Sequence, residues 1–195
     1  MIKTIHYSVL SFFAVLLCAG TAHAEWKLDN DASHLSYVSM KNSSVAEPNY
    51  FRNLSGSVLD DGKAVVEISM GSVETNIDIR NERVKKHLFN ISEFPVATIT
   101  SQLDMSQFKN VAMGQSLNAE ITIHVSMVGV DNDYDVEATI YRVSNNAVLV
   151  TSRNQIIVDA DDYDLTGGLE TLRNIAKLNS IETVVPVSFA LMFKQ

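Results

Sequence analysis

The side chains best suited to catalysis or metal binding are few and scattered in this sequence. His34, His87 and His124 are the histidines beyond the first 24 residues, and none lies three to five residues from another. Protein sites for zinc and copper draw mainly on His and Cys ligands that are often closely spaced. The single cysteine, Cys18, falls within the first 24 residues. We therefore predict no metal site.

Four acidic residues, Asp159, Asp161, Asp162 and Asp164, form one local cluster of oxygen ligands. An EF-hand calcium loop needs a central glycine and a distal glutamate, and the run D-A-D-D-Y-D has neither. The nucleophile elbow, the phosphate-binding glycine loop and the zinc-protease motif are also absent from the sequence. The pattern favours a solvated turn and a protein without catalytic residues. An enzyme acting on a lipid-like substrate is the alternative, because active sites assemble from residues distant in sequence.

Basic side chains are concentrated in the segment from Arg80 to His87. Alternating apolar residues precede it, from Val73 to Ile79, and a second strand-like run follows, from Val96 to Leu103. The pattern predicts a strand, a short charged helix and another strand. Two interpretations of the charges stay open. They form a solvated helix face with a Glu82–Lys86 ion pair, or one of them contacts a ligand headgroup at the mouth of a pocket.

Short motifs in and after this segment resemble those of a known family. They are T-N at 75–76, R-N-E-R at 80–83, H-L-F at 87–89 and F-P-x-A-T-x-T-S at 94–101. Together they are similar to the signature of the YceI-like family, bacterial envelope proteins whose lipocalin-like barrel holds a polyisoprenoid or related lipid. Many members have an Arg-Asp pair, for which this chain offers Arg80–Asn81 or Arg83–Val84. The resemblance extends over residues 26–193 and implies a lipid-holding barrel.

Residues 1–24 have the pattern of a signal peptide. Lys3 provides the positive charge, Val9 to Ala19 the apolar stretch, and Ala22-His23-Ala24 a cleavage site of small residues before Glu25. The apolar stretch is too short to span a membrane. Cys18 follows a bulky leucine, whereas a lipoprotein anchor needs a small residue at that place. We therefore predict cleavage after Ala24 and a location of the protein in the periplasm or outside the cell.

The rest of the chain, residues 25–195, is acidic and undivided. The whole chain has 15 basic and 23 acidic residues, and removal of Lys3 leaves 14 against 23, a net charge of −9. Such a charge disfavours nucleic acids and anionic membrane surfaces as partners, and no segment predicts stable membrane insertion. Three prolines and no internal repeat predict one domain, large enough for one core without disulfides. Homodimer formation stays open.

Alternating apolar and polar residues predict about eight antiparallel strands. The clearest runs from Leu117 to Met127, with six apolar positions facing five polar ones, as in a half-buried strand. Further strands are expected at 26–41, 51–58, 64–70, 134–142, 147–158 and 183–193, with turns or loops at 42–49, 60–62, 131–133, 145–146 and 159–168. A second helix is expected over 169–178, with Thr166 as its cap.

Long strands with one continuous apolar face favour a closed barrel over a sandwich, because closure removes exposed strand edges. The fold that we predict is all-β: an elongated eight-stranded antiparallel lipocalin-like barrel with one or two short helices. A barrel of eight strands is about wide enough to hold one slender ligand.

Inward-facing apolar side chains and the residues at the mouth are predicted to bind that ligand. The expected ligand-binding residues are Tyr37, Phe51, Ile68, Arg80, Arg83, His87, Phe89, Phe94, Ile121, Ile123, Val125, Ile140, Phe189 and Leu191. We expect one long apolar lipid, an isoprenoid quinone, a polyprenyl lipid or a fatty-acyl compound, and no metal or catalytic cofactor. The alternative without a ligand is a structural protein whose bulky side chains fill the barrel.

We predict that the exported protein begins at Glu25, because the small residues Ala22 and Ala24 fit the positions before a signal-peptide cleavage site. Intact-mass measurement of the protein purified after export tests this directly. A diacylated Cys18 at the N-terminus would contradict the prediction.

Overall fold

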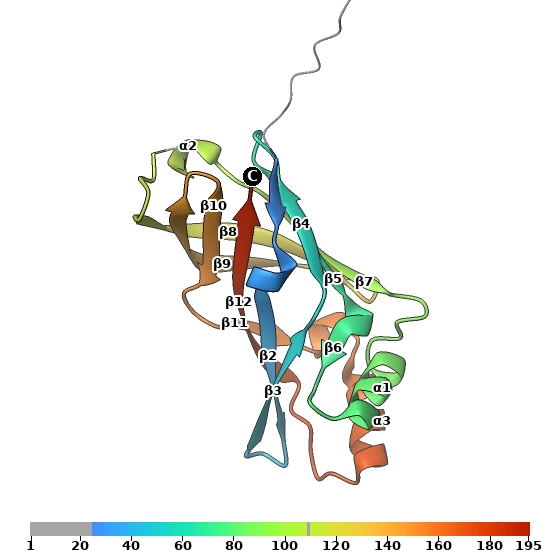
Figure 1. Cartoon of the computed structure of the whole chain (residues 1–195). Coiled ribbons are helices and arrows are strands. Elements are labelled where there is room, and N and C mark those ends of the chain that lie inside the picture. Colours follow the sequence, from blue (N-terminus) through green and yellow to red (C-terminus); the bar gives the residue numbers. More distant parts are fainter. Residues whose placement is uncertain (1–24, 109) are drawn as a thin grey trace, which may run out of the picture.

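The computed structural model describes residues 25–108 and 110–195 (Figure 1). Its strands are β1 (Trp26–Leu28), β2 (His34–Lys41), β3 (Val45–Phe51), β4 (Leu54–Val58), β5 (Lys63–Ser69), β6 (Val73–Glu74), β7 (Val96–Gln102), β8 (Ser116–Met127), β9 (Val130–Ser144), β10 (Ala147–Ser152), β11 (Ile156–Asp159) and β12 (Val184–Lys194). Its helices are α1 (Asp78–His87), α2 (Met105–Phe108) and α3 (Thr166–Ala176), with 3₁₀ turns at Asn30–Ala32, Met70–Ser72 and Asp161–Tyr163. Among the described residues, no helix is long and apolar enough to cross a membrane. The signal peptide expected at 1–24 lies outside the described residues.

Eight strands form a closed barrel, because the first strand pairs with the last. Hydrogen-bonded neighbours follow the order β1, β4, β5, β7, β8, β9, β10 and β12. The circle closes where β12 pairs with β1 through Lys27–Lys194 and Leu28–Phe193. The pairings around the circle are all antiparallel. The eight-stranded antiparallel barrel predicted from the sequence is confirmed, with the four-residue α2 as a helix that the pattern did not predict.

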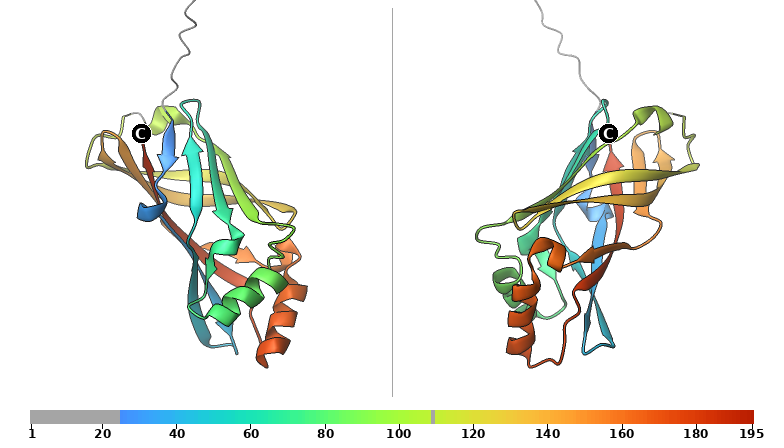
Figure 2. Two further views of the ribbon diagram at one scale, coloured as in Figure 1. Left: turned by 45° about the vertical axis from the view of Figure 1, so that its right-hand side comes forward. Right: turned by 180° about the vertical axis from the view of Figure 1, so that it is seen from behind.

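The barrel is extended at one end by strands that pair beyond the circle. The first part of β12 pairs with β2 and β11, and its last part pairs with β1 and β10. The β2–β3 hairpin, α1 and α3 lie together at this extended end, at the bottom of Figures 1 and 2. A Cβ at Gly168 would lie 2.6 Å from the backbone oxygen of His87. Glycine at this position therefore allows α3 to pack closely against the end of α1.

The β8–β9 hairpin shows the sequence pattern most directly. Exposure alternates along β8, and every residue of this strand has a partner on β9, from Ser116–Tyr141 to Met127–Val130. Val128 and Gly129 form a two-residue turn with φ of 49° and 82°, the geometry that matches the twist of paired strands. The turn expected at 131–133 is therefore wrong. Those residues belong to β9 and are mostly exposed.

Two other expected segments differ because tertiary pairing overrides the local pattern. The expected loop at 42–49 is largely strand β3, whose backbone groups pair with β2. The expected strand at 73–79 contains only the two residues of β6. Asn76 has a positive φ of 62°, which ends the extended chain, and α1 then begins at Asp78.

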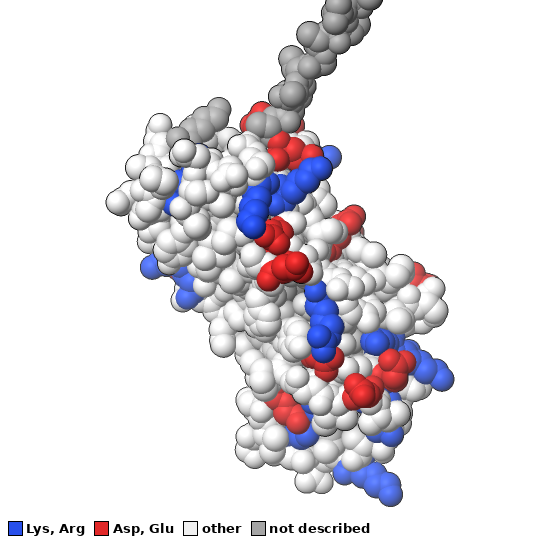
Figure 3. Space-filling view, in the orientation of Figure 1, with Lys and Arg blue, Asp and Glu red and all other residues white. Residues whose placement is uncertain are grey.

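The remaining differences concern breaks and caps. The expected strands at 26–41 and 147–158 are each divided into two strands. Thr166 does not cap α3 but is its first residue, and its hydroxyl donates to Asp161 Oδ1 at 3.2 Å. The face of the molecule in Figure 3 mixes both signs of charge and shows no continuous basic patch of the kind that nucleic acids bind.

A buried carboxylate attaches α1 to the sheet. Glu74 is 8 % exposed and accepts hydrogen bonds from Asn81 Nδ2 (3.0 Å), the backbone N–H of Asn76 (2.5 Å) and Arg52 Nη2 (2.7 Å). Asn81 Oδ1 also accepts bonds from the backbone N–H and the hydroxyl of Thr75, at 2.7 and 2.6 Å. Hydrogen bonds to the charged form lower the pKa of Glu74 to about 2, with Asn81 the largest cause and Arg52 the next.

We predict that Glu74→Gln lowers the free energy of unfolding at neutral pH, because a neutral amide loses these charge-assisted bonds. On folding, the pKa of Glu74 falls from its ordinary 4.5 to about 2. Its stabilisation is therefore complete above pH 4.5 and is lost as the pH falls toward 2. The difference in urea midpoint between wild type and variant should shrink over that range.

The matched control is Glu82→Gln, because Glu82 lies on the exposed side of the same helix. It should change the urea midpoint little at any pH. A Glu74→Gln deficit that stays constant from pH 7 to pH 2 would contradict the assignment of the stabilising charge to Glu74.

Candidate functional site

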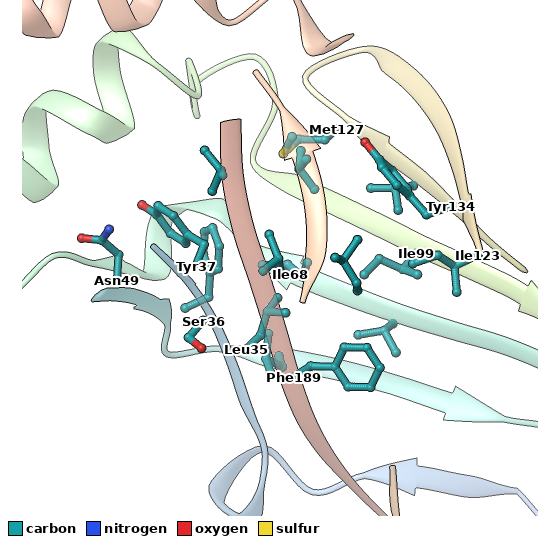
Figure 4. Close-up of a pocket in the computed structure, with 18 of the residues that line it drawn as sticks. Leu35, Ser36, Tyr37, Asn49, Ile68, Ile99, Ile123, Met127, Tyr134 and Phe189 are labelled. Atoms are coloured by element: carbon teal, nitrogen blue, oxygen red, sulfur yellow. The ribbon is translucent and has the colours of Figure 1, made fainter. Parts of the chain in front are cut away.

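A cavity of about 750 Å³ occupies the interior of the barrel and extends toward α1 and α3. Every strand of the closed barrel contributes to its wall, which is mainly aliphatic and aromatic. Figure 4 shows Leu35, Ile68, Ile99, Ile123 and Phe189 among the lining side chains. The volume lies within the range of roughly 300–1,000 Å³ that is typical of small-molecule sites. Side chains therefore do not fill the barrel, in contrast to the packed-core alternative.

The structure places most of the expected ligand-binding residues in this wall. The lining includes Tyr37, Phe51, Ile68, Arg80, Arg83, Phe89, Ile121, Ile123, Val125, Ile140, Phe189 and Leu191. His87 and Phe94 lie outside it. His87 ends α1, where its backbone meets α3, and the Phe94 ring packs over the β8–β9 turn, 3.1 Å from where a Cβ on Gly129 would lie.

The histidines do not form a reactive centre inside the cavity. None of His34, His87 and His124 contributes to the wall. His124 is on the outer side of β8, with Nδ1 2.7 Å from Asp133 Oδ1. In the described part of the chain, no three His, Cys, Asp or Glu side chains come together in an arrangement suited to a metal ion.

Arg80 reaches from α1 to β3 and forms an ion pair at the edge of the cavity. Its Nη1 donates to Glu47 Oε2 at 2.5 Å, and its Nη2 donates to the backbone oxygen of Thr75. Glu47 Oε1 also accepts a bond from Lys41 Nζ at 2.8 Å. The Arg80 guanidinium, more than Lys41, holds the pKa of Glu47 below its ordinary value. Arg80 is therefore committed to a structural pair and is not a solvated helix charge.

Arg83 lines the cavity three residues further along α1, and its charge has no such partner. No ion pair within 4.0 Å among the described residues involves Arg83. The expected Glu82–Lys86 pair is also absent there, because Glu82 pairs with Lys85 at 3.0 Å. Of the two arginines that line the cavity from α1, Arg83 is the one whose charge is available to a ligand headgroup.

Two tyrosines form a second polar region of the wall, which we call the tyrosine pair. Tyr134 lies on β9 and Tyr163, which is 1 % exposed, ends the 3₁₀ turn at 161–163. Both hydroxyl oxygens are buried, and neither has a hydrogen-bond partner among the described residues. Burial raises the pKa of both phenols, so they stay protonated. Figure 4 shows Tyr134 across the cavity from Tyr37 and Asn49.

The sequence predicts the position of some of these polar residues in the cavity wall and not of others. Tyr134 and Ile140 lie an even number of residues apart on β9, so the alternation of the strand predicts that both side chains point inward. Tyr163 is the one aromatic residue in the acidic run 159–164, which the pattern interprets only as a solvated turn. Glu47 carries no signal, because the polar run around it predicts a loop and its partner Arg80 is 33 residues away.

Comparison with known proteins agrees with this geometry. The family model described as the YceI-like domain matches residues 26–193. The chain belongs to the YceI-like family. The match covers the whole closed barrel except the last residue of β12.

Solved structures with this fold come from several bacteria. This YceI-like chain is similar to a polyisoprenoid binding domain from Saccharophagus degradans implicated in plant cell wall breakdown, at 36 % identity and a TM-score of 0.85, covering 87 % of this chain and 97 % of that one. It is similar in fold to BcnA of Burkholderia cenocepacia, at 18 % identity, a TM-score of 0.64 and coverage of 85 % and 98 %. The YceI protein of Campylobacter jejuni shares the fold at 14 % identity, a TM-score of 0.55 and coverage of 75 % and 84 %. No curated protein sequence matches the chain.

For this YceI-like barrel we predict that replacing Arg80 destabilises the fold and that replacing Arg83 does not. Arg80→Ala should lower the free energy of unfolding by about 1–3 kcal/mol, because Glu47 is then left partly buried without its main partner. Arg83→Ala should change it by less than about 0.5 kcal/mol, since Arg83 has no ion pair or side-chain hydrogen bond among the described residues to lose. Urea unfolding at pH 7 measures both. Equal losses in the two variants would contradict the distinction between a structural and an available arginine.

Proposed function

We propose that this protein is a non-enzymatic binding protein that holds one long apolar lipid inside its barrel. The observation that carries the proposal is the cavity of about 750 Å³ with its mainly aliphatic and aromatic wall. Water in such a space gains few hydrogen bonds from the wall, whereas a hydrocarbon chain gains contacts along its whole length.

Solvent exclusion supplies the affinity. Burial of apolar surface contributes about 25 cal/mol per Å², so hydrocarbon on the order of a few hundred Å² contributes several kcal/mol before the costs of ordering the chain. This contribution depends on area and not on chain chemistry. The wall therefore selects a class of ligand, and the few polar groups of the cavity distinguish members of that class.

The likeness to a polyisoprenoid binding domain at 36 % identity supports isoprenoid quinones and polyprenyl lipids as ligands, with fatty-acyl compounds as the third class. The signal-peptide pattern at 1–24, outside the described residues, supports export to the periplasm or the medium. Storage, delivery and protection of the lipid are all compatible with this binding mode.

The direct test is native mass spectrometry of protein freshly purified from its natural host, followed by organic extraction. We expect a stoichiometric mass increment that extraction removes and that matches an apolar lipid in the extract. A clean mass of the protein alone from that source would contradict the proposal.

We predict that Ile123→Trp displaces the ligand with little change in the urea midpoint of the ligand-free protein. Ile123 lines the cavity from β8, so the larger ring should extend into open space and take volume from the ligand. In a filled core the same change would overpack the interior and cost about 1–3 kcal/mol. Ligand occupancy by mass spectrometry and the urea midpoint are measured on the same preparations.

The neighbouring outward position provides the matched control. His124→Trp adds an indole to the outer side of β8, where the His124 ring lies beside the surface carboxylates of Asp131 and Asp133. It should leave ligand occupancy unchanged. Unchanged occupancy together with a lowered midpoint for Ile123→Trp would show that this part of the wall faces a filled core.

A further inference from the structure

The tyrosine pair places two hydrogen-bond donors in the wall of an otherwise apolar cavity. Buried polar groups in native proteins are nearly always paired, and an unpaired one costs free energy. Among the described residues, the buried unpartnered side-chain atoms are the hydroxyls of Tyr134 and Tyr163 and the Nε of Arg80. Arg80 already uses its two other nitrogens. In the tyrosine pair, by contrast, the only polar atom of each side chain has no hydrogen-bond partner among the described residues.

Regular backbone elements hold the Cα atoms of both tyrosines, and the packed core surrounds their rings. Tyr134 lies in the middle of the β8–β9 ladder, directly opposite Ile123. Tyr163 ends a 3₁₀ turn in which its N–H bonds the carbonyl of Ala160, and Asp164 closes the turn with a φ of 55°. The Tyr163 ring belongs to the buried core, and Tyr134 packs against that core.

The surroundings of the tyrosine pair define the kind of group that fits between the hydroxyls. The two phenols approach closely enough that each affects the pKa of the other, and the Asn132 side chain also lowers that of Tyr163. Neither hydroxyl, however, has a partner in hydrogen-bond geometry among the described residues. Burial is the largest cause of the raised pKa of both phenols; among the smaller causes, the Asp162 carboxylate raises the pKa of both, and Asp159 raises that of Tyr134. Nearby negative charge disfavours an anion here, whereas protonated phenols favour an uncharged hydrogen-bond acceptor.

We propose that Tyr134 and Tyr163 form a subsite that donates hydrogen bonds to an uncharged carbonyl oxygen of the bound lipid, as in a quinone, an ester or an amide. The proposal rests on the proposed function, because it assigns a polar subsite within the same cavity. It also distinguishes two polar regions of the cavity wall by the charge of the group that each favours. An anionic headgroup is favoured beside Arg83, and a neutral carbonyl is favoured at the tyrosine pair.

The test compares two probes of similar length, of which one carries hydrogen-bond-accepting oxygens and the other carries none. Decylubiquinone has two quinone carbonyls, and dodecylbenzene has a ring and an alkyl chain without oxygen. The affinity of delipidated full-length exported protein for each probe is measured by displacement of N-phenyl-1-naphthylamine, whose own affinity is determined for every variant. The variants are Tyr134→Phe, Tyr163→Phe and the double variant, with Tyr141→Phe as control, because Tyr141 is 42 % exposed and lies outside the cavity wall.

We expect the double variant to bind decylubiquinone at least about tenfold more weakly, and each single variant about three- to tenfold more weakly. Affinity for dodecylbenzene should change by less than about twofold. The thermal midpoint of the ligand-free protein should stay constant or rise, since the substitution removes an unpaired buried hydroxyl. Tyr141→Phe should match wild type. If Tyr163→Phe does not fold, Tyr134→Phe alone makes the same comparison.

Each contrary result has a distinct meaning. Equal weakening of both probes overturns the subsite and shows that the rings only shape the wall. Unchanged decylubiquinone affinity also overturns it, and a lowered thermal midpoint would then assign the hydroxyls to the stability of the empty protein. Failure of wild type to bind either probe contradicts the proposed lipid-binding function itself.

Discussion

The pairing of β12 with four other strands is the constraint on which the cavity depends. β12 closes the barrel against β1 and β10 and extends it against β2 and β11. Because side chains alternate along a strand, this pairing leaves one row of β12 inside, namely Val185, Val187, Phe189, Leu191 and Phe193. A shift of register by one residue would turn that row outward and bring the intervening residues into the cavity. The register of one strand therefore determines both the closure of the barrel and the apolar character of its interior.

An apolar wall that faces open space lacks the contacts that a packed core would provide. Polar bonds at the extended end offset part of this loss, because Glu74 attaches α1 to the sheet and Arg80 joins α1 to Glu47. A lipid that binds only the folded state adds stability in proportion to the logarithm of its concentration over its dissociation constant. Binding of such a lipid and stability are thus linked, whereas the hydrogen bonds around α1 stabilise the fold without a ligand.

Sequence patterns predict the parts of this fold that local periodicity determines. The alternation from Leu117 to Met127 predicts β8 and its inward residues, because a strand buried on one face must alternate. The same reasoning fails for β3, where pairing with β2 supplies the backbone bonds that its polar sequence does not suggest. It fails again at 131–133, since Gly129 suits the positive φ of the true turn. The Arg80–Glu47 pair and the meeting of Tyr134 with Tyr163 join distant segments, and no spacing in the sequence encodes such contacts.

Recognition in this cavity divides between a wall that accepts many chains and a few polar groups that distinguish headgroups. A hydrocarbon chain interacts with the wall through area alone, so changes in its length or branching alter affinity gradually. A polar group that must be satisfied acts more sharply, because a ligand without the matching acceptor leaves a buried donor unpaired. The charges near the two polar regions have opposite sign, with Arg83 at one and Asp159 and Asp162 near the other. In the proposed binding mode, the charge of a lipid's polar group therefore decides which of the two polar regions it favours.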